Sequence, residues 1–326
     1  MSRRFWVNAF AILVAVGAIV AVVVYLRANQ EIWQLLGNLT AVQVLLLIGV
    51  RIIFLGLNGV LLYLIAQKFA VTLSPMEWFS LAYMTALFNY IMPFSGGMLI
   101  RATYLKLQHH IAYAQFAAWL AATYFVIFFV TGVVNAVLAL WLTTAVPAAW
   151  FLVVFFLMMA GGILIVLLIP SFRFPANNRL FLLANTALAG WDAIKTDRRL
   201  LMRLTLFTLL LFLSNGLSFW LAYRSLGIAV SWGAAFIVSL ANIYSAVVSL
   251  TPGNIGLQEA MVSLFSQLTG AGIEESLLTI LLVRVTTLVS VFTLGPLCTF
   301  WLARRLGGNR LFEQNLEVLD GVGEQV

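Results

Sequence analysis

The sequence predicts an all-α, polytopic membrane protein, and three observations support this fold class. Hydrophobic residues make up 63% of the 326 residues and charged residues only 9%, whereas about a quarter of a soluble domain is charged. The apolar residues gather into stretches of about twenty, the length of a helix that crosses a bilayer. In addition, residues 57–74 resemble residues 214–231, and such an internal repeat indicates that the fold contains two similar structural units.

Six apolar stretches are long enough to be full membrane spans. They are residues 6–25, 42–66, 113–142, 147–169, 202–223 and 276–303. The first follows Arg3 and Arg4 and could be a signal peptide. We favour an uncleaved span, because the apolar run is long and no small-residue cleavage site precedes Arg27.

Two other apolar regions, 77–109 and 232–269, are interrupted by proline and glycine. The interruptions lie at 93–97 and 252–256, and each half is too short to cross a bilayer. A broken backbone at membrane depth is stable only where it is buried in protein or faces a wet cavity. We therefore expect two re-entrant helical hairpins. The alternative is that the prolines only kink ordinary spans.

Each hairpin follows one copy of the repeat. The recurring residues are Asn58, Gly59, Leu64 and Ser74, which return as Asn215, Gly216, Leu221 and Ser231. Three predicted spans separate the starts of the two copies, so the second copy should be inverted across the membrane, as in many transporters. The whole chain is then one transmembrane domain, divided into 1–41 (first span and outer loop), 42–169 (repeat 1), 170–201 (cytoplasmic connector), 202–305 (repeat 2) and 306–326 (cytoplasmic tail).

The net charge of +7 does not predict a nucleic-acid partner, because excess Lys and Arg in a membrane protein usually reports orientation. With Arg3 and Arg4 inside, most of the Lys and Arg residues fall on the cytoplasmic side. We expect an integral protein of the plasma (inner) membrane with both termini in the cytoplasm. Within 170–201, a weak amphipathic pattern indicates either a helix on the membrane surface or a packed connector.

The second helix of each hairpin should begin at the bilayer midplane, directly after the glycines. The first N–H groups of a helix lack intrahelical partners and carry partial positive charge, so they bind anions. Two such ends would suit the phosphate of a lipid headgroup. The residues predicted to contact it are Gly96, Gly97, Gly253, Asn254 and Gly256.

Three charged residues complete the predicted substrate site. Arg101 and Glu259 occupy equivalent positions in the two returning helices, and Arg284 lies within the last span. Ionisable groups at membrane depth are costly and usually functional. We expect Arg101 to contact an anionic headgroup, Glu259 a cation, proton or arginine, and Arg284 the substrate or Glu259. A static Arg101–Glu259 salt bridge is the alternative. Arg51 also lies within a span and implies a polar interior, the alternative being that it reaches water at the outer end of that span.

Other chemistry has no sequence support. We find no nucleophile–base set, no paired carboxylates at depth and no phosphate-binding nucleotide loop. His109 and His110 fall at a helix end where interfacial placement is expected, and no acidic or histidine ligands have metal spacing. We expect a protein that is not an enzyme and has no cofactor or metal.

The hairpin motifs resemble a known family. Residues 249–260 resemble the Pro-Gly-Gly-Ile-Gly-x-x-Glu-Ala signature of lysylphosphatidylglycerol synthase transmembrane-region proteins, also called flippase-like membrane proteins. Residues 93–105 are similar to an earlier motif of that family, and Arg284 fits the arginine of its following span. Asn254 departs from the usual second glycine, Met98 stands where a glutamate is common, and the family's Arg-x-x-Asp is absent around 122–126.

The resemblance implies movement of lipids between leaflets, since relatives are associated with aminoacylated phospholipids, polyprenyl-linked sugars or other lipids. We expect no aminoacyl-transferase domain. The expected function is a flippase for an anionic phospholipid or a polyprenyl-phosphate-linked lipid. The alternative is a non-transporting membrane subunit that partners a glycosyltransferase or lipid-modifying enzyme.

Overall fold

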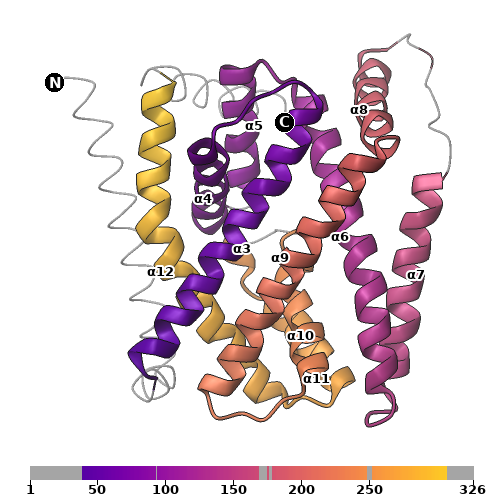
Figure 1. The fold of residues 1–326 in the computed structure, drawn as a ribbon, viewed down its shortest axis with the longest axis vertical. Coiled ribbons are helices and arrows are strands. Elements are labelled where there is room, and N and C mark those ends of the chain that lie inside the picture. The colour runs from indigo at the N-terminus through magenta and orange to yellow at the C-terminus, as the bar shows by residue number, and fades with distance from the viewer. Residues whose placement is uncertain (1–38, 93, 169–174, 176–177, 248–251, 307–326) are drawn as a thin grey trace.

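The computed structural model describes residues 39–92, 94–168, 175, 178–247 and 252–306 (Figure 1). This part of the chain is all-α and contains no strand. The helices are α3 (Ala41–Lys68), α4 (Pro75–Ile91), α5 (Gly96–His109), α6 (Tyr113–Leu142), α7 (Ala149–Leu168), α8 (Arg179–Lys195), α9 (Arg198–Ser225), α10 (Trp232–Ser245), α11 (Leu257–Thr269) and α12 (Ile273–Arg305), with a short 3-10 turn, η1, at Pro252–Asn254.

Five helices are long and apolar enough to cross a membrane, namely α3, α6, α7, α9 and α12. They coincide with five of the six predicted spans. The remaining prediction, 6–25, lies outside the described residues, as do residues 307–326 of the predicted tail. The sequence underestimated the length of α12, which extends over the acidic residues Glu274 and Glu275 because they suit the positive end of a helix.

The first repeated element is a long helix. Helices α3 and α9 both contain 28 residues, and they pack against each other. They run antiparallel, because Lys68 in the last turn of α3 forms a 2.7 Å ion pair with Asp197, the residue that caps the start of α9. The two copies therefore form matching helices that point in opposite directions (Figure 1).

The second repeated element is a short helix that packs closely against the long one. Ser74 and Ser231 are the N-caps of α4 and α10. A Cβ on Gly59 would lie 2.6 Å from the Trp78 backbone oxygen in α4, and one on Gly216 would lie 2.4 Å from the Phe236 ring in α10. The repeated glycines thus allow each long helix to approach its short partner.

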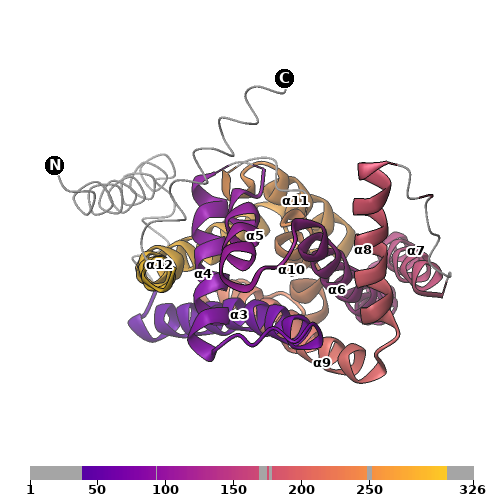
Figure 2. The ribbon, with the colours of Figure 1, turned by 90° about the horizontal axis from the view of Figure 1, so that it is seen from above.

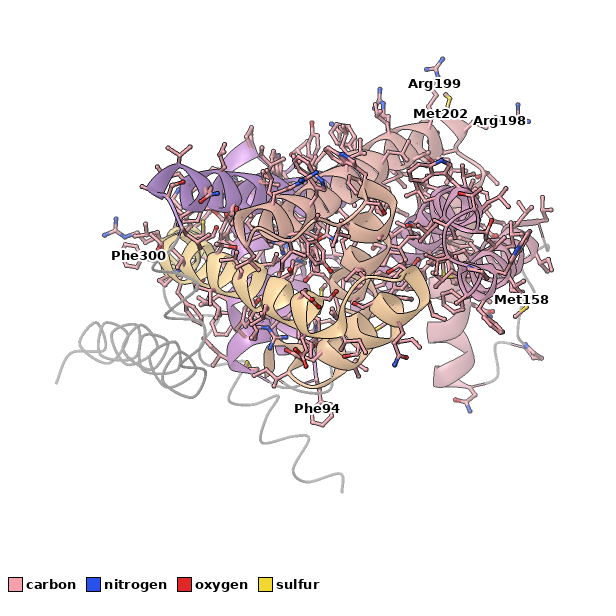
Figure 3. The ribbon with its side chains drawn as sticks, turned by 90° about the horizontal axis from the view of Figure 1, so that it is seen from below. Phe94, Met158, Arg198, Arg199, Met202 and Phe300 are labelled. Atoms are coloured by element: carbon pink, nitrogen blue, oxygen red, sulfur yellow. The ribbon has the colours of Figure 1, made fainter. Side chains whose placement is uncertain are left out.

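Two helical hairpins, α4–α5 and α10–α11, occupy opposite halves of the bundle (Figure 1). Their breaks lie where the sequence predicts them, and left-handed backbone interrupts each, at Phe94 and Ser95 in one and at Gly253 and Asn254 in the other. Phe94 is 75% exposed and its side chain projects away from the bundle (Figure 3). Such a residue suits a lipid environment.

Seen from above, the hairpins lie between α12 and α6, with α3 and α9 along one side (Figure 2). Helices α7 and α8 lie at the far side of α6. Helix α8 is the predicted connector helix, and it packs on α6 through Gly190, which is close to Ala118, and through Trp191, which meets Phe125 edge to face. The described helix of the connector, α8, therefore packs against α6.

Candidate functional site: a polar cavity between the hairpins

A cavity of about 170 Å³ lies between the two hairpins, beside the second break. Its polar lining includes Asn89, Tyr90 and Arg101 from the first hairpin, Asn242, Asn254 and Gln258 from the second, and Arg51, Asn58 and Tyr124 from α3 and α6. The second break packs against the end of α4, because a Cβ on Gly253 would lie 2.8 Å from the Tyr90 ring. The fold thus brings together two segments separated by about half of the chain.

Two buried arginines give the cavity its charge. Arg51 is 2% exposed, donates from Nη1 to Asn215 Oδ1 at 3.1 Å, and stacks over the Phe54 ring. Arg101 is 7% exposed and donates from Nε to Thr85 Oγ1 at 2.7 Å. Among the described residues, neither has a carboxylate within ion-pair distance, and no Asp or Glu lines the cavity.

No acidic side chain in the described part of the chain compensates this positive charge. Removing an ion from water costs several kcal/mol even after the surroundings relax. Neutral hydrogen-bond acceptors and an aromatic face offset only part of that cost. Since buried charges in native proteins are usually paired, Arg51 and Arg101 indicate a site for an anion.

The third buried arginine is neutralised. Arg284 Nη1 lies 2.7 Å from Glu259 Oε1, and Nη2 donates to Gln258 Oε1 at 2.7 Å. The other oxygen of Glu259 accepts from the N–H of Gly256 at 2.8 Å, which caps the start of α11. Glu259 therefore pairs with Arg284, and the alternative Arg101–Glu259 salt bridge is wrong.

Hydrogen bonds connect this ion pair to Arg51. Gln258 Nε2 donates to Asn242 Oδ1 at 3.0 Å, and Asn242 Nδ2 donates to Asn215 Oδ1 at 2.8 Å. Asn215 also accepts from Arg51, so one polar chain runs from α12 through the second hairpin to α3. The repeated Asn215 is thus a hub between helices, whereas its counterpart Asn58 donates to Phe54 O within its own helix and lines the cavity.

Two of the predicted amides, those of Gly97 and Gly256, are occupied, which corrects the expectation that these N–H groups are free to face the substrate. The Gly97 N–H donates to Asn89 Oδ1 at 2.9 Å, and the Gly256 N–H binds Glu259. Gly96 and Gly97 allow close packing, since a Cβ on Gly97 would lie 2.0 Å from Thr85 O. Side chains of the same hairpins cap their own helices, so guanidinium groups supply the positive charge of the cavity.

Of the eight predicted site residues, Arg101, Gly253 and Asn254 line the cavity, and Glu259 and Arg284 form the adjacent ion pair. Asn254 Oδ1 is buried and has no hydrogen-bond partner within the described part of the chain. Asn89, Asn242 and Gln258 also line the cavity but were not predicted, because their only signal in the sequence is their polarity within apolar hairpins. Arg51 lies in the predicted polar interior and does not reach water, because it is 2% exposed and its guanidinium group binds Asn215 of α9.

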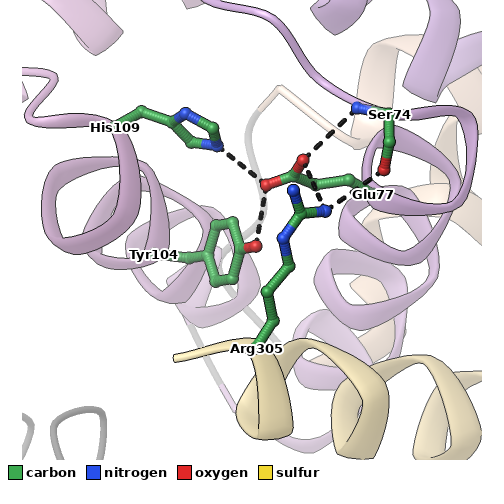
Figure 4. Close-up of polar contacts among 5 residues, drawn as sticks. All are labelled: Ser74, Glu77, Tyr104, His109 and Arg305. Carbon is green, nitrogen blue, oxygen red and sulfur yellow. Dashed lines mark hydrogen bonds and ion pairs between the residues drawn. The ribbon is translucent and has the colours of Figure 1, made fainter. Parts of the chain in front are cut away.

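A second buried polar group, the Glu77 cluster, lies at the end of the bundle where α3, α5 and α12 end (Figure 4). It comprises Ser74, Glu77, Tyr104, His109 and Arg305. Glu77 is fully buried and accepts from Tyr104 Oη at 2.8 Å; its oxygens lie 2.7 Å from His109 Nε2 and 3.0 Å from Arg305 Nη1.

Electrostatics in the Glu77 cluster are balanced. Burial alone would raise the pKa of Glu77, but the hydrogen bonds from His109 and Tyr104, together with the positive charge of Arg305, hold that pKa below its usual value. The carboxylate therefore joins α4, α5 and α12. His109, which we expected at an interface, is one of its partners.

Comparison with known proteins identifies one family. The family described as lysylphosphatidylglycerol synthase TM region matches residues 8–295, which is most of the chain. No curated protein and no solved structure matches.

Proposed function

The chain belongs to the lysylphosphatidylglycerol synthase TM region family of membrane domains, and from this premise we propose that it is a lipid flippase. Its substrate would be an anionic phospholipid or a polyprenyl-phosphate-linked lipid. The headgroup phosphate would bind in the cavity while the acyl or prenyl chains remain in the bilayer. No covalent step and no cofactor is part of this proposal.

The observation that carries the proposal is the uncompensated charge of Arg51 and Arg101 beside the meeting hairpins. A guanidinium group matches two oxygens of a phosphate with parallel hydrogen bonds. The partner that the protein does not provide is thus a phosphate-like anion. A membrane-embedded location favours a lipid as its source.

An amphiphile also suits the space next to the cavity. A smaller pocket of about 50 Å³ adjoins it between α3, α5 and α6, and the two share Arg101, Asn58 and Tyr124. Leu62, Ile65 and Leu120 give this annex an apolar wall. A headgroup at Arg101 could therefore extend its first apolar atoms into the annex.

We further propose that the two copies of the repeat are related by inversion and rock against each other to alternate access. The antiparallel packing of α3 and α9 and the hairpins in opposite halves of the bundle support this. The hairpins would be re-entrant, one from each face of the membrane. A site between them can face either leaflet when the halves move.

The charges at the ends of the bundle support one orientation of the protein across the membrane. The end at which α3, α5 and α12 finish is basic, with Lys68, Lys106, Arg304 and Arg305. Since cytoplasmic loops are enriched in Lys and Arg, we propose that this end faces the cytoplasm of a cell whose plasma membrane holds the protein, with both termini on the same side.

The test is lipid transfer in proteoliposomes that contain the full chain and phosphatidylglycerol with a fluorescent acyl chain. A membrane-impermeant reductant reports which leaflet holds the lipid. We expect transfer by the wild type and its loss in Arg101→Met. The matched control is Arg199→Gln, because Arg199 is exposed at the periphery (Figure 3) and should keep wild-type transfer. Equal transfer by Arg101→Met would contradict the proposal.

The alternative is a non-transporting subunit that holds a lipid for a glycosyltransferase or lipid-modifying enzyme. The same cavity would serve it. Lipid binding that Arg101→Met weakens, without any transfer by the wild type, would favour this second function.

A further inference from the structure

The charge and hydrogen-bonding groups of the cavity restrict the headgroup. We infer that the cavity selects a phosphate ester with a neutral, hydroxylated substituent and rejects headgroups that carry an ammonium group. This inference rests on the proposed lipid binding and deepens it. Its class of ligand includes glycerol-phosphate and sugar-phosphate headgroups, and it excludes aminoacylated and ethanolamine headgroups.

The exclusion follows from the distribution of charge. Two arginines line the cavity without any carboxylate in the described lining. The nearest acid in the polar chain, Glu259, is held by Arg284 and by the N–H of Gly256. An ammonium group would meet like charges and no counter-ion. In a site shielded from water, such a juxtaposition is strongly unfavourable.

One position, Met98, keeps Arg101 without an acidic partner among the described residues. Met98 and Arg101 are three residues apart on α5, so they share a helix face, and both line the cavity and its annex. An acidic side chain there would lie beside the guanidinium group and neutralise it. The uncharged thioether therefore preserves the positive charge that the phosphate would meet.

The hydroxyl preference follows from the free acceptors. Asn254 Oδ1 is buried in the cavity wall and has no partner among the described residues. Asn58 uses its Nδ2 to bind Phe54 O, which leaves its Oδ1 without a protein donor among the described residues. An amide oxygen accepts from a hydroxyl group, and a glycerol or sugar substituent offers hydroxyls close to the phosphate. A neutral polyol would thus satisfy both acceptors without adding charge.

The first experiment compares phosphatidylglycerol with lysyl-phosphatidylglycerol, because the two differ only by the aminoacyl ester. Binding to the purified full chain would be measured by native mass spectrometry in detergent, with phosphatidylethanolamine as a third probe. We expect phosphatidylglycerol to bind at least about tenfold more tightly than either amine-containing lipid. Equal binding, or tighter binding of lysyl-phosphatidylglycerol, would overturn the inference.

The second experiment changes the charge at one position. Met98→Glu should reduce or reverse the preference for phosphatidylglycerol, and Met98→Gln separates the charge from the change in shape. We expect the preference for phosphatidylglycerol to be lost in Met98→Glu and retained in Met98→Gln, because only glutamate carries a negative charge. The same tenfold preference in a folded Met98→Glu variant would contradict the role of Met98, and the wild-type comparison stands even if this variant does not fold.

Binding and transfer separate this inference from the proposed function. Selective binding without transfer would support the inference and contradict transport. Transfer of both lipids at equal rates would support transport and overturn the inference. A polyprenyl-phosphate sugar that outcompetes phosphatidylglycerol would identify a sugar as the neutral substituent. Water-soluble glycerol phosphate that competes as well as the lipid would support the headgroup chemistry and contradict a lipid substrate.

Discussion

The cavity and the Glu77 cluster are both buried and polar, but they differ in charge balance. Glu77 has three side-chain partners that include two basic residues, and its oxygens accept hydrogen bonds from several donors. Within the described residues, Arg51 and Arg101 have only neutral partners. A satisfied buried charge joins elements of the fold, whereas an unsatisfied one is costly to the fold and available to a ligand. Burial alone therefore does not identify a binding site.

The largest expected effect is a loss of lipid transfer without a loss of stability. It would test the difference between the cavity and the Glu77 cluster. In the double variant Arg51→Met and Arg101→Met, we expect lipid transfer to fall on the order of 100-fold or more, because two charge-assisted contacts to phosphate are lost. Thermal unfolding in detergent should be unchanged or shifted upward, since apolar groups replace two unpaired buried charges. Thr85 still donates to Leu81 O, so no new orphan hydroxyl appears.

A clear decrease in the unfolding temperature of that double variant would show that the arginines are structural. The distinction between the two buried regions would then be lost.

The opposite change is expected at the Glu77 cluster. Glu77→Ala leaves Arg305 and Tyr104 without their shared partner, and we expect the free energy of unfolding to fall by about 3 kcal/mol. Transfer measured below the unfolding temperature should remain. Glu274→Ala is the control, because Glu274 is exposed at the start of α12 and should cost less than about 1 kcal/mol. If Glu77→Ala and Glu274→Ala reduce the free energy of unfolding by similar amounts, the Glu77 cluster has no special structural role.

A glycine substitution tests how hairpin packing supports the cavity. In Gly97→Ala, the new Cβ would clash with the Thr85 backbone oxygen, so α4 and α5 must separate. We expect a loss of about 1–3 kcal/mol of stability together with weaker lipid binding. Gly161→Ala in α7 is the matched control, since nothing lies within 4 Å of its added Cβ. Equal melting curves would indicate that the hairpin tolerates a wider spacing.

The smallest effect is the pH dependence of the Glu77 cluster. Because the folded protein lowers the pKa of Glu77 below 4.5, the carboxylate contributes stability above that value. This contribution is lost as the pH falls through the lowered folded pKa. The stability difference between wild type and Glu77→Gln should therefore be largest near neutral pH and shrink in acid. If the stability difference between wild type and Glu77→Gln grows in acid, the folded protein does not lower the pKa of Glu77.

Much of the fold could be predicted, because the bilayer restricts the options. Apolar length identifies a span directly, which is why five predicted spans coincide with α3, α6, α7, α9 and α12. The recurring residues occupy corresponding places in the structure. Ser74 and Ser231 are the N-caps of the short helices α4 and α10, and Gly59 and Gly216 lie where α3 and α9 approach these short helices closely. These are local signals that a short segment carries by itself.

The site was only partly predictable. Arg101, Glu259 and Arg284 stand out as charges in apolar sequence, but their pairing depends on which helices are neighbours. Nothing local distinguishes Arg284, which Glu259 neutralises, from Arg51, which has no acidic partner among the described residues. Likewise, a helix N-terminus in the sequence does not reveal that Asn89 already occupies the Gly97 N–H.

The sequence by itself determined that this is a helical membrane protein, because hydrophobic length is a property of the linear chain. Only the tertiary structure decided which buried charges are balanced. Electrostatic energy depends on the distance between atoms and on their exclusion from water, and both arise when α3, α12 and the two hairpins pack together. That packing leaves Arg51 and Arg101 as positive charges around one small cavity.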